Sequence, residues 1–204
     1  MKTPIVLIAL ILAGALCITV LLSSPNTPKP KSPAAMKKQI ERGSYLVHGG
    51  GCNDCHSPKI FTPQGPIPDT TKLLSGHPAE SKLPEIPKGV LGPQGWGALV
   101  SGDLTAWVGP WGTSFTRNLT PDTATGIGSW TEDIFIKAIR TGKDMGEGRD
   151  ILPPMPWPEY RNLTDDDLRA IFAYLMSLPP VENAVPDPIS PTGEQLPTLS
   201  KPKQ

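Results

Sequence analysis

Apolar residues recur at intervals of three and four positions in three stretches of the chain, which predicts three amphipathic helices. The first covers about residues 36–48 and ends at a run of glycines. The second lies in SWTEDIFIKAIRTG, residues 129–142, where Ser129 and Glu132 have the spacing of a capping box. The third lies in LTDDDLRAIFAYLMSLPP, residues 163–180, where the threonine caps the helix and the prolines end it.

The start of the chain has a different pattern, in which residues 5–22 carry no charge and Lys2 precedes them. A segment of this length lies at the short end of what spans a bilayer, and a positive charge on its N-terminal side favours a cytoplasmic N-terminus. We expect a signal anchor or transmembrane helix over residues 1–24, with the remaining chain outside the cytoplasm. A cleaved signal peptide and a lipid attached to Cys17 are the alternatives.

Proline-rich segments flank the region of the predicted helices. Residues 25–35 contain four prolines and no large apolar side chain, which predicts an extended tether. Residues 186–204 have the same character and are expected to form a disordered tail. Between them we expect one domain, residues 36–185, with an all-α fold. A long insertion from residue 57 to about residue 115 interrupts it, rich in Pro, Gly and Trp and without a sustained period.

Composition and charge limit the classes of function. The chain has 19 basic and 19 acidic residues, so its formal net charge is zero and nothing favours nucleic-acid binding. Bases predominate in residues 25–60 and acids in residues 121–187, which predicts either a dipolar surface or ordinary solvated helix faces. Apolar residues make up 38% of the chain, a small share for a packed core. We therefore expect a cofactor to fill part of the interior.

The strongest chemical signal is the sequence CNDCH, which contains Cys52, Cys55 and His56. Cys-x-x-Cys-His is the attachment motif of haem c, because two thiols at this spacing reach one side of a porphyrin and the imidazole then lies under the iron. The neutral ring would bind iron through one nitrogen and donate from the other to a backbone carbonyl. Pro58 and the loop 63–68 offer such carbonyls. A dithiol enzyme and half of a zinc site are the alternative interpretations.

A sixth iron ligand is expected from a second loop. Met155 lies in PPMPW, where three prolines prevent a helix and would present a thioether from a rigid, apolar segment. The other candidates for this ligand are Met36, Met145, Met176, His48 and His77. The carboxylates of a haem need partners when they are buried, and Arg117 is our candidate for that role.

The order of a first helix, Cys-x-x-Cys-His, a proline-flanked methionine and a final helix resembles class I monohaem cytochromes c. NLTPDTATGIGSWTEDIFIKAIRTGKD, ILPPMPWPEY and LTDDDLRAIFAYLMSLPP are similar to bacterial membrane-anchored cytochrome c subunits of dehydrogenases and respiratory complexes. The resemblance covers about residues 38–182 and implies three to five helices around one covalent haem. It also implies thioether attachment by Cys52 and Cys55, a proximal ligand His56, a distal ligand Met155, and a close crossing of the first and last helices at Gly43.

The resemblance implies a single-electron carrier rather than an enzyme. Its partners would be membrane-bound redox proteins, namely a dehydrogenase, a quinol-oxidising complex or a terminal oxidase. The domain would lie on the periplasmic side of the cytoplasmic membrane, held by a single-pass N-terminal helix. Two alternatives stay open: an open-site haem enzyme that binds peroxide or a small gas, and a fixed haem-bearing structural subunit of a respiratory complex.

Overall fold

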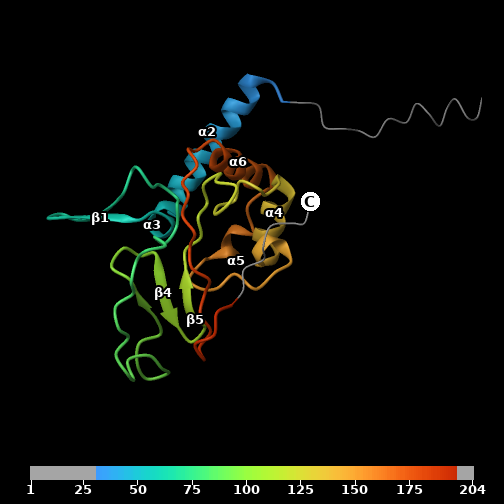
Figure 1. Cartoon of the computed structure of the whole chain (residues 1–204). Coiled ribbons are helices and arrows are strands. Elements are labelled where there is room, and N and C mark those ends of the chain that lie inside the picture. Colours follow the sequence, from blue (N-terminus) through green and yellow to red (C-terminus); the bar gives the residue numbers. More distant parts are fainter. Residues whose placement is uncertain (1–30, 197–204) are drawn as a thin grey trace, which may run out of the picture. The chain divides into compact units, whose positions relative to one another are not determined.

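The structure is a computed structural model that describes residues 31–196. The expected membrane segment, residues 1–24, and most of the expected tether lie outside these residues. No helix between residues 31 and 196 is long and apolar enough to cross a membrane. The elements shown in Figure 1 are, in chain order, α2 (Pro33–Gly49), α3 (Cys52–His56), β1 (Lys59–Thr62), β2 (Gly65–Pro68), β3 (Leu99–Val100), β4 (Ala106–Gly109), β5 (Gly112–Phe115), α4 (Glu132–Thr141), the 3-10 turn η1 (Asp144–Gly146), α5 (Trp157–Tyr160) and α6 (Asp165–Met176).

The prediction of an all-α fold is wrong, because the region between α3 and α4 forms two small antiparallel sheets. Strands β1 and β2 form a hairpin with Lys59 opposite Pro68, and β3, β4 and β5 form a second sheet in that order. Each strand spans only two to four residues, which is too short for an alternation of apolar and polar positions to stand out. The fold is therefore mixed, with helices and strands.

The three predicted helices are present as α2, α4 and α6. Helix α6 begins as predicted, because the Thr164 side chain accepts a hydrogen bond from the backbone N–H three residues on, at 3.1 Å. Helix α4 begins later than predicted, because Thr131 caps it in place of Ser129. Its end matches the prediction, since Gly142 has a φ of +67°, a value that favours glycine.

Helices α2 and α6 cross in close contact at Gly43. This glycine is buried, and a Cβ atom built on it would overlap the carbonyl group of Ala170 and lie 2.8 Å from the Cβ of Tyr174. Only a residue without a side chain allows the two backbones to approach this closely. The close crossing expected at Gly43 is confirmed.

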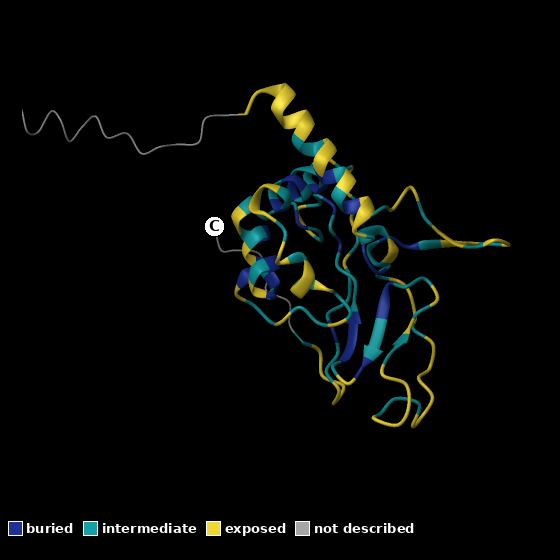
Figure 2. Ribbon diagram, turned by 180° about the vertical axis from the view of Figure 1, so that it is seen from behind, coloured by how far each residue is buried: buried dark blue, intermediate teal, exposed yellow. Residues whose placement is uncertain are grey.

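The apolar core lies among α2, α4 and α6, where Figure 2 shows buried segments in dark blue. The rings of Phe135 in α4 and Phe172 in α6 pack with centroids 5.4 Å apart. Leu74 and Ile127 come from irregular segments and are nevertheless fully buried. The long region between α3 and α4 therefore packs onto the helices and contributes to their core. The other buried apolar members of the core are Val47, Ile139, Leu168 and Leu175.

The segment that follows α6 binds back onto the region between α3 and α4. The side-chain amide of Asn183 donates to the carbonyl oxygens of Ser75 at 2.7 Å and His77 at 2.9 Å. The amide of Asn118 donates in the other direction, to the carbonyl oxygen of Val181 at 2.8 Å. Asn118 is fully buried, so these bonds fasten the segment after α6 inside the domain.

Part of the expected tail, residues 186–204, also makes defined contacts. Ile189 pairs with Thr113 of β5 through two backbone hydrogen bonds of 2.7 and 2.9 Å. The description ends at residue 196, and residues 197–204 lie outside it. The described part of this segment therefore adds a short backbone pairing to the edge of the second sheet.

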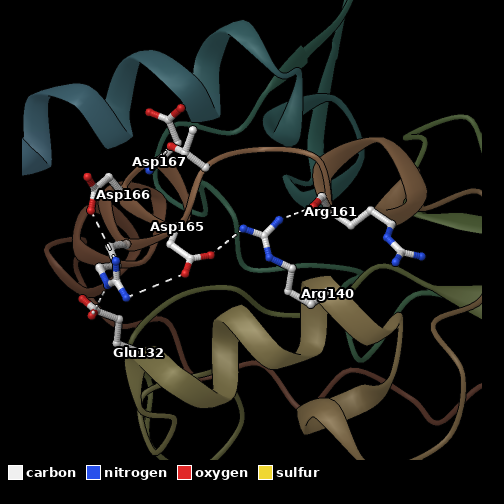
Figure 3. A network of polar contacts seen from close by, with 8 residues as sticks. Glu132, Arg140, Arg161, Asp165, Asp166 and Asp167 are labelled. Carbon is white, nitrogen blue, oxygen red and sulfur yellow. Dashed lines mark hydrogen bonds and ion pairs between the residues drawn. The ribbon is translucent and has the colours of Figure 1, made fainter.

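Arginines from α2 and α4 pair with the acidic first turn of α6, and Figure 3 shows the part of this network around α4. An acidic residue in the first turn also complements the positive end of a helix. The ion pairs that join the three helices are Arg42–Asp167 (2.9 Å), Arg140–Asp165 (2.5 Å) and Arg169–Glu132 (3.1 Å). The acidic first turn of α6 therefore also takes part in joining this helix to α2 and α4.

We expect these pairs to make stability depend on acid pH. The hydrogen bond from Arg42 lowers the pKa of Asp167 below its ordinary value, about 3.9. The stabilisation is complete above that ordinary value and is lost as the pH falls through the folded-state pKa. Urea unfolding between about pH 2.5 and pH 7 should give a shallower decline for Arg42→Gln than for the unchanged protein. Equal declines would contradict a role for this pair.

Candidate functional site

The short helix α3 carries the two cysteines of the CNDCH sequence. Gly51 precedes it with a φ of +70°, and Ser57 ends it in an extended conformation. Cys52 and Cys55 are both free thiols, and a spacing of three residues places them on the same side of a helix. Burial raises the pKa of Cys52 to about 11 and also raises that of Cys55. Both are therefore neutral thiols at pH 7 that share one face.

His56 completes the motif and its ring is oriented by a distant carbonyl. Its Nδ1 lies 2.8 Å from the backbone oxygen of Arg117. Because a carbonyl only accepts, Nδ1 carries the hydrogen and Nε2 keeps its lone pair. Burial lowers the pKa of His56, so the ring is neutral at pH 7. The carbonyl comes from a residue 61 positions away, and neither Pro58 nor the loop 63–68 supplies it.

Two chain segments hold His56 in place. The backbone N–H of Gly76 donates to the carbonyl oxygen of His56 at 2.7 Å, and the N–H of Leu74 donates to the Ser57 hydroxyl at 2.9 Å. Gly76 has a φ of +80°, and a Cβ there would lie 2.5 Å from the carbonyl oxygen of Thr116. The segment around Gly76 therefore fits tightly between α3 and the segment after β5, which contains the carbonyl of Arg117 that orients the imidazole.

Helix α5, which follows the Met155 loop, contacts the chain just before Cys52. The Tyr160 hydroxyl donates to the carbonyl oxygen of Gly50 at 2.6 Å. Burial, followed by the charge of the two nearby thiols when ionised, raises the pKa of Tyr160. Met155 and Cys52 are both partly buried and pack against the same apolar core. Met155 and Cys52 therefore both contribute to the edge of this core.

Arg117 lies at the border of a cavity of about 530 Å³. Its guanidinium pairs with Asp144 at 2.5 Å and stacks on the ring of Trp130, 5.0 Å from the centroid. Arg149 lines the same cavity, and the Nε atoms of both arginines are buried without a hydrogen-bond partner. Sequence reasoning missed Arg149, which has no distinguishing neighbours along the chain.

Most of the predicted site residues do not line this cavity. Its lining includes Met145, but it does not include the two cysteines, His56 or Met155. Met145 has a φ of +53°, a backbone conformation that is uncommon outside glycine. Met145 therefore lines the same cavity as Arg117, whereas Met155 packs against the apolar core that Cys52 also contacts.

The remaining candidates for a distal ligand have other environments. Met36 is exposed on α2, and Met176 packs against the core. His48 is exposed and its Nδ1 contacts the carbonyl of its own helix at 2.7 Å. His77 is buried, with Nδ1 bonded to the Thr105 hydroxyl at 2.8 Å. Residues 31–196 contain no cluster of three or more His, Cys, Asp or Glu side chains able to hold a metal ion.

The donor groups of this region fit a covalently attached haem. Two neutral thiols share one face, a neutral imidazole keeps Nε2 for iron, and the thioether of Met155 packs against the apolar core that Cys52 also contacts. The two buried, unpartnered Nε–H groups of Arg117 and Arg149 are suited to bind carboxylates.

Comparison with known proteins points in the same direction. No family model matches the chain. The chain is 32% identical over 149 residues to the gluconate 2-dehydrogenase cytochrome c subunit of Pantoea cypripedii. The aligned region covers 72% of this chain and 25% of the relative. It is 45% identical over 83 residues to the cytochrome c subunit of the quinone alcohol dehydrogenase of Gluconobacter oxydans (strain 621H), covering 38% of this chain and 17% of the relative.

A third relative is a diheme cytochrome c-type protein of Cereibacter sphaeroides, 26% identical over 164 residues, which cover 80% of this chain and 44% of the relative. The chain thus spans a quarter or less of the two dehydrogenase subunits described above. These similarities support the cytochrome c family. The monohaem class I type stays a prediction.

Proposed function

We propose that this chain, as a relative of cytochrome c subunits of dehydrogenases, is an electron-transfer subunit with one covalently bound haem c. Cys52 and Cys55 would form the thioether bonds, His56 would be the proximal ligand and Met155 the distal ligand. The observation that carries the proposal is the hydrogen bond from Nδ1 of His56 to the carbonyl oxygen of Arg117, 2.8 Å long. It leaves Nε2 available for iron on the residue that directly follows Cys55.

A bound haem supplies the reversible exchange of one electron between Fe(III) and Fe(II), and the chain supplies attachment, ligation and a dry surrounding. The carbonyl of Arg117 holds the imidazole of His56 in one orientation, so the ring does not have to turn between redox states. The proline-flanked loop presents the Met155 sulfur from a segment whose Pro153 carbonyl is bonded to the Ser114 hydroxyl at 2.6 Å. Both ligands would therefore be held before an electron arrives.

The carboxylates of the haem need positive partners because burial of an unpaired charge is costly. Arg117 and Arg149 each keep a buried Nε–H without a partner in the structure. Asp144 holds the other end of the Arg117 guanidinium, and Trp130 covers its face. We assign the haem carboxylates to this pair of arginines, with Arg117 as the first candidate.

The partner in this proposal is a membrane-bound dehydrogenase or another respiratory redox protein, from which or to which the domain passes single electrons. The names of the dehydrogenase relatives support this choice. The uncharged run in residues 5–22 supports export across the cytoplasmic membrane, with residues 1–24 as its anchor and residues 36–185 as the haem domain on the periplasmic side. The chain itself would carry electrons and would not act on an organic substrate.

One haem per chain is proposed because the sequence has three cysteines and a single Cys-x-x-Cys-His motif. We expect the intact mass of the full chain, expressed with a haem-attachment system, to exceed the polypeptide mass by one haem. Acid-acetone extraction should leave this haem on the protein, while the variant Cys52→Ser, Cys55→Ser should carry none. An unchanged polypeptide mass, or haem that is released by the extraction, would overturn the proposal.

A further inference from the structure

The side chain of Lys59 reaches from the first residue of β1 back to the end of α3. Its ammonium group donates to the backbone carbonyl oxygens of Asn53, Asp54 and Ser57 at 3.2, 2.8 and 2.5 Å. A lysine ammonium has three N–H donors and no acceptor. All three donors can therefore be used at once, and all are directed at the same turn of chain.

The end of this turn has backbone carbonyl groups that need partners from outside the helix. The carbonyl groups of the last turn of a helix lack partners within that helix, and α3 is only five residues long. The carbonyl of His56 is taken by the N–H of Gly76 at 2.7 Å. Lys59 binds three other carbonyl groups of the same turn. A single side chain therefore holds the backbone before Cys55 and after His56.

The ammonium group is partly withdrawn from water in this position. Burial lowers the pKa of Lys59, while the carboxylates of Asp103 and Asp54 act against that shift. A positive charge that is partly shielded from solvent acts more strongly on its neighbours than one on an exposed side chain. Lys59 differs in this respect from an exposed lysine such as Lys82.

We infer that Lys59 is a positioning residue of the site, which holds the Cys-x-x-Cys-His turn and raises the reduction potential of the group bound there. The inference rests on the proposed function, because it requires a haem at His56. Uptake of one electron by Fe(III) to give Fe(II) lowers the total charge of the site by one, with no bond made or broken. A fixed positive charge beside the turn stabilises the state of lower charge.

The test is a redox titration of the haem-loaded full chain. Lys59→Met keeps the length of the apolar stem but removes the charge and the three donors. We expect the equilibrium constant for reduction to fall about fivefold, roughly 40 mV at 59 mV per tenfold for one electron. Lys59→Arg keeps the charge and can donate to carbonyls, so its midpoint potential should stay closer to that of the unchanged chain. Lys82→Met removes one exposed charge and should leave the midpoint potential unchanged.

The haem content of each variant separates this inference from the proposed function. If the unchanged chain lacks covalent haem, the proposed function fails. If Lys59→Met carries haem and has the midpoint potential of the unchanged chain, Lys59 has no such role. A further outcome is that Lys59→Met fails to acquire haem. If Lys59→Arg then still carries haem, the result supports a role of Lys59 in positioning the turn. If both variants lose haem equally, the inference is overturned.

Discussion

Replacing Met155 with alanine is expected to leave the haem attached and to open the distal side of the iron. The change removes a thioether from the Pro-rich loop without touching Cys52, Cys55 or His56. Water should then enter, so that the spectrum becomes high-spin and cyanide or carbon monoxide binds readily. Axial ligands tune haem potentials over about 0.8 V, so a fall on the order of 100 mV is expected. Absorption spectra and a redox titration measure both effects.

Met145→Ala is the matched comparison, because Met145 is also a half-buried methionine but lines the cavity beside Arg117. It should leave the low-spin spectrum and the midpoint potential as they are. A third variant, Met155→His, should stay low-spin with a markedly lower potential, because imidazole stabilises Fe(III) more than a thioether does. A ligand-loss spectrum for Met145→Ala, with an ordinary spectrum for Met155→Ala, would exchange the roles of the two methionines.

Replacing Gly43 with alanine should cost about 2–3 kcal/mol of unfolding free energy, as overpacking of a buried contact does. The added methyl group would overlap the carbonyl group of Ala170, so α2 and α6 have to move apart. Gly43→Val should cost more, because its branched side chain needs still more room. For a domain of this size the midpoint temperature should fall by roughly 5–10 °C for the alanine variant. Thermal unfolding followed by circular dichroism measures the change.

Gly49→Ala provides a control in the same helix. A Cβ at Gly49 meets no atom within 4 Å, so its effect on the unfolding free energy should stay within about 1 kcal/mol, the size of an intrinsic helix preference. If Gly43→Ala were tolerated as well as Gly49→Ala, the close crossing would not be required for stability.

Local signals in the sequence were sufficient for the helices. Helix α6 could be located because a threonine cap, an apolar stripe and two terminal prolines all lie within one stretch of chain. The start of α4 was placed too early because Ser129 and Thr131 are both good caps, and only the structure shows which hydroxyl reaches a free N–H. The role of Gly43 follows only from the family resemblance, because the sequence around a glycine inside a helix does not show which other helix packs against it.

The strands and the second half of the site depend on contacts between distant residues. Strands of two to four residues gain their stability from pairing with one another and from packing, so their sequences carry little independent information. The carbonyl that orients His56 belongs to Arg117, and any residue type could supply it because the contact is made by the backbone. Sequence chemistry could therefore identify the imidazole but not its hydrogen-bond partner.

Asn183 has a consequence for where this domain can be cut. All the proposed iron ligands and attachment cysteines precede the end of α6, so a chain shortened there would look complete by its motifs. It would lack the amide that links the carbonyls of Ser75 and His77, and the buried Asn118 would lose its acceptor at Val181. A fragment designed around the motifs alone would lose these hydrogen bonds, and we therefore expect the smallest stable fragment to extend past residue 183.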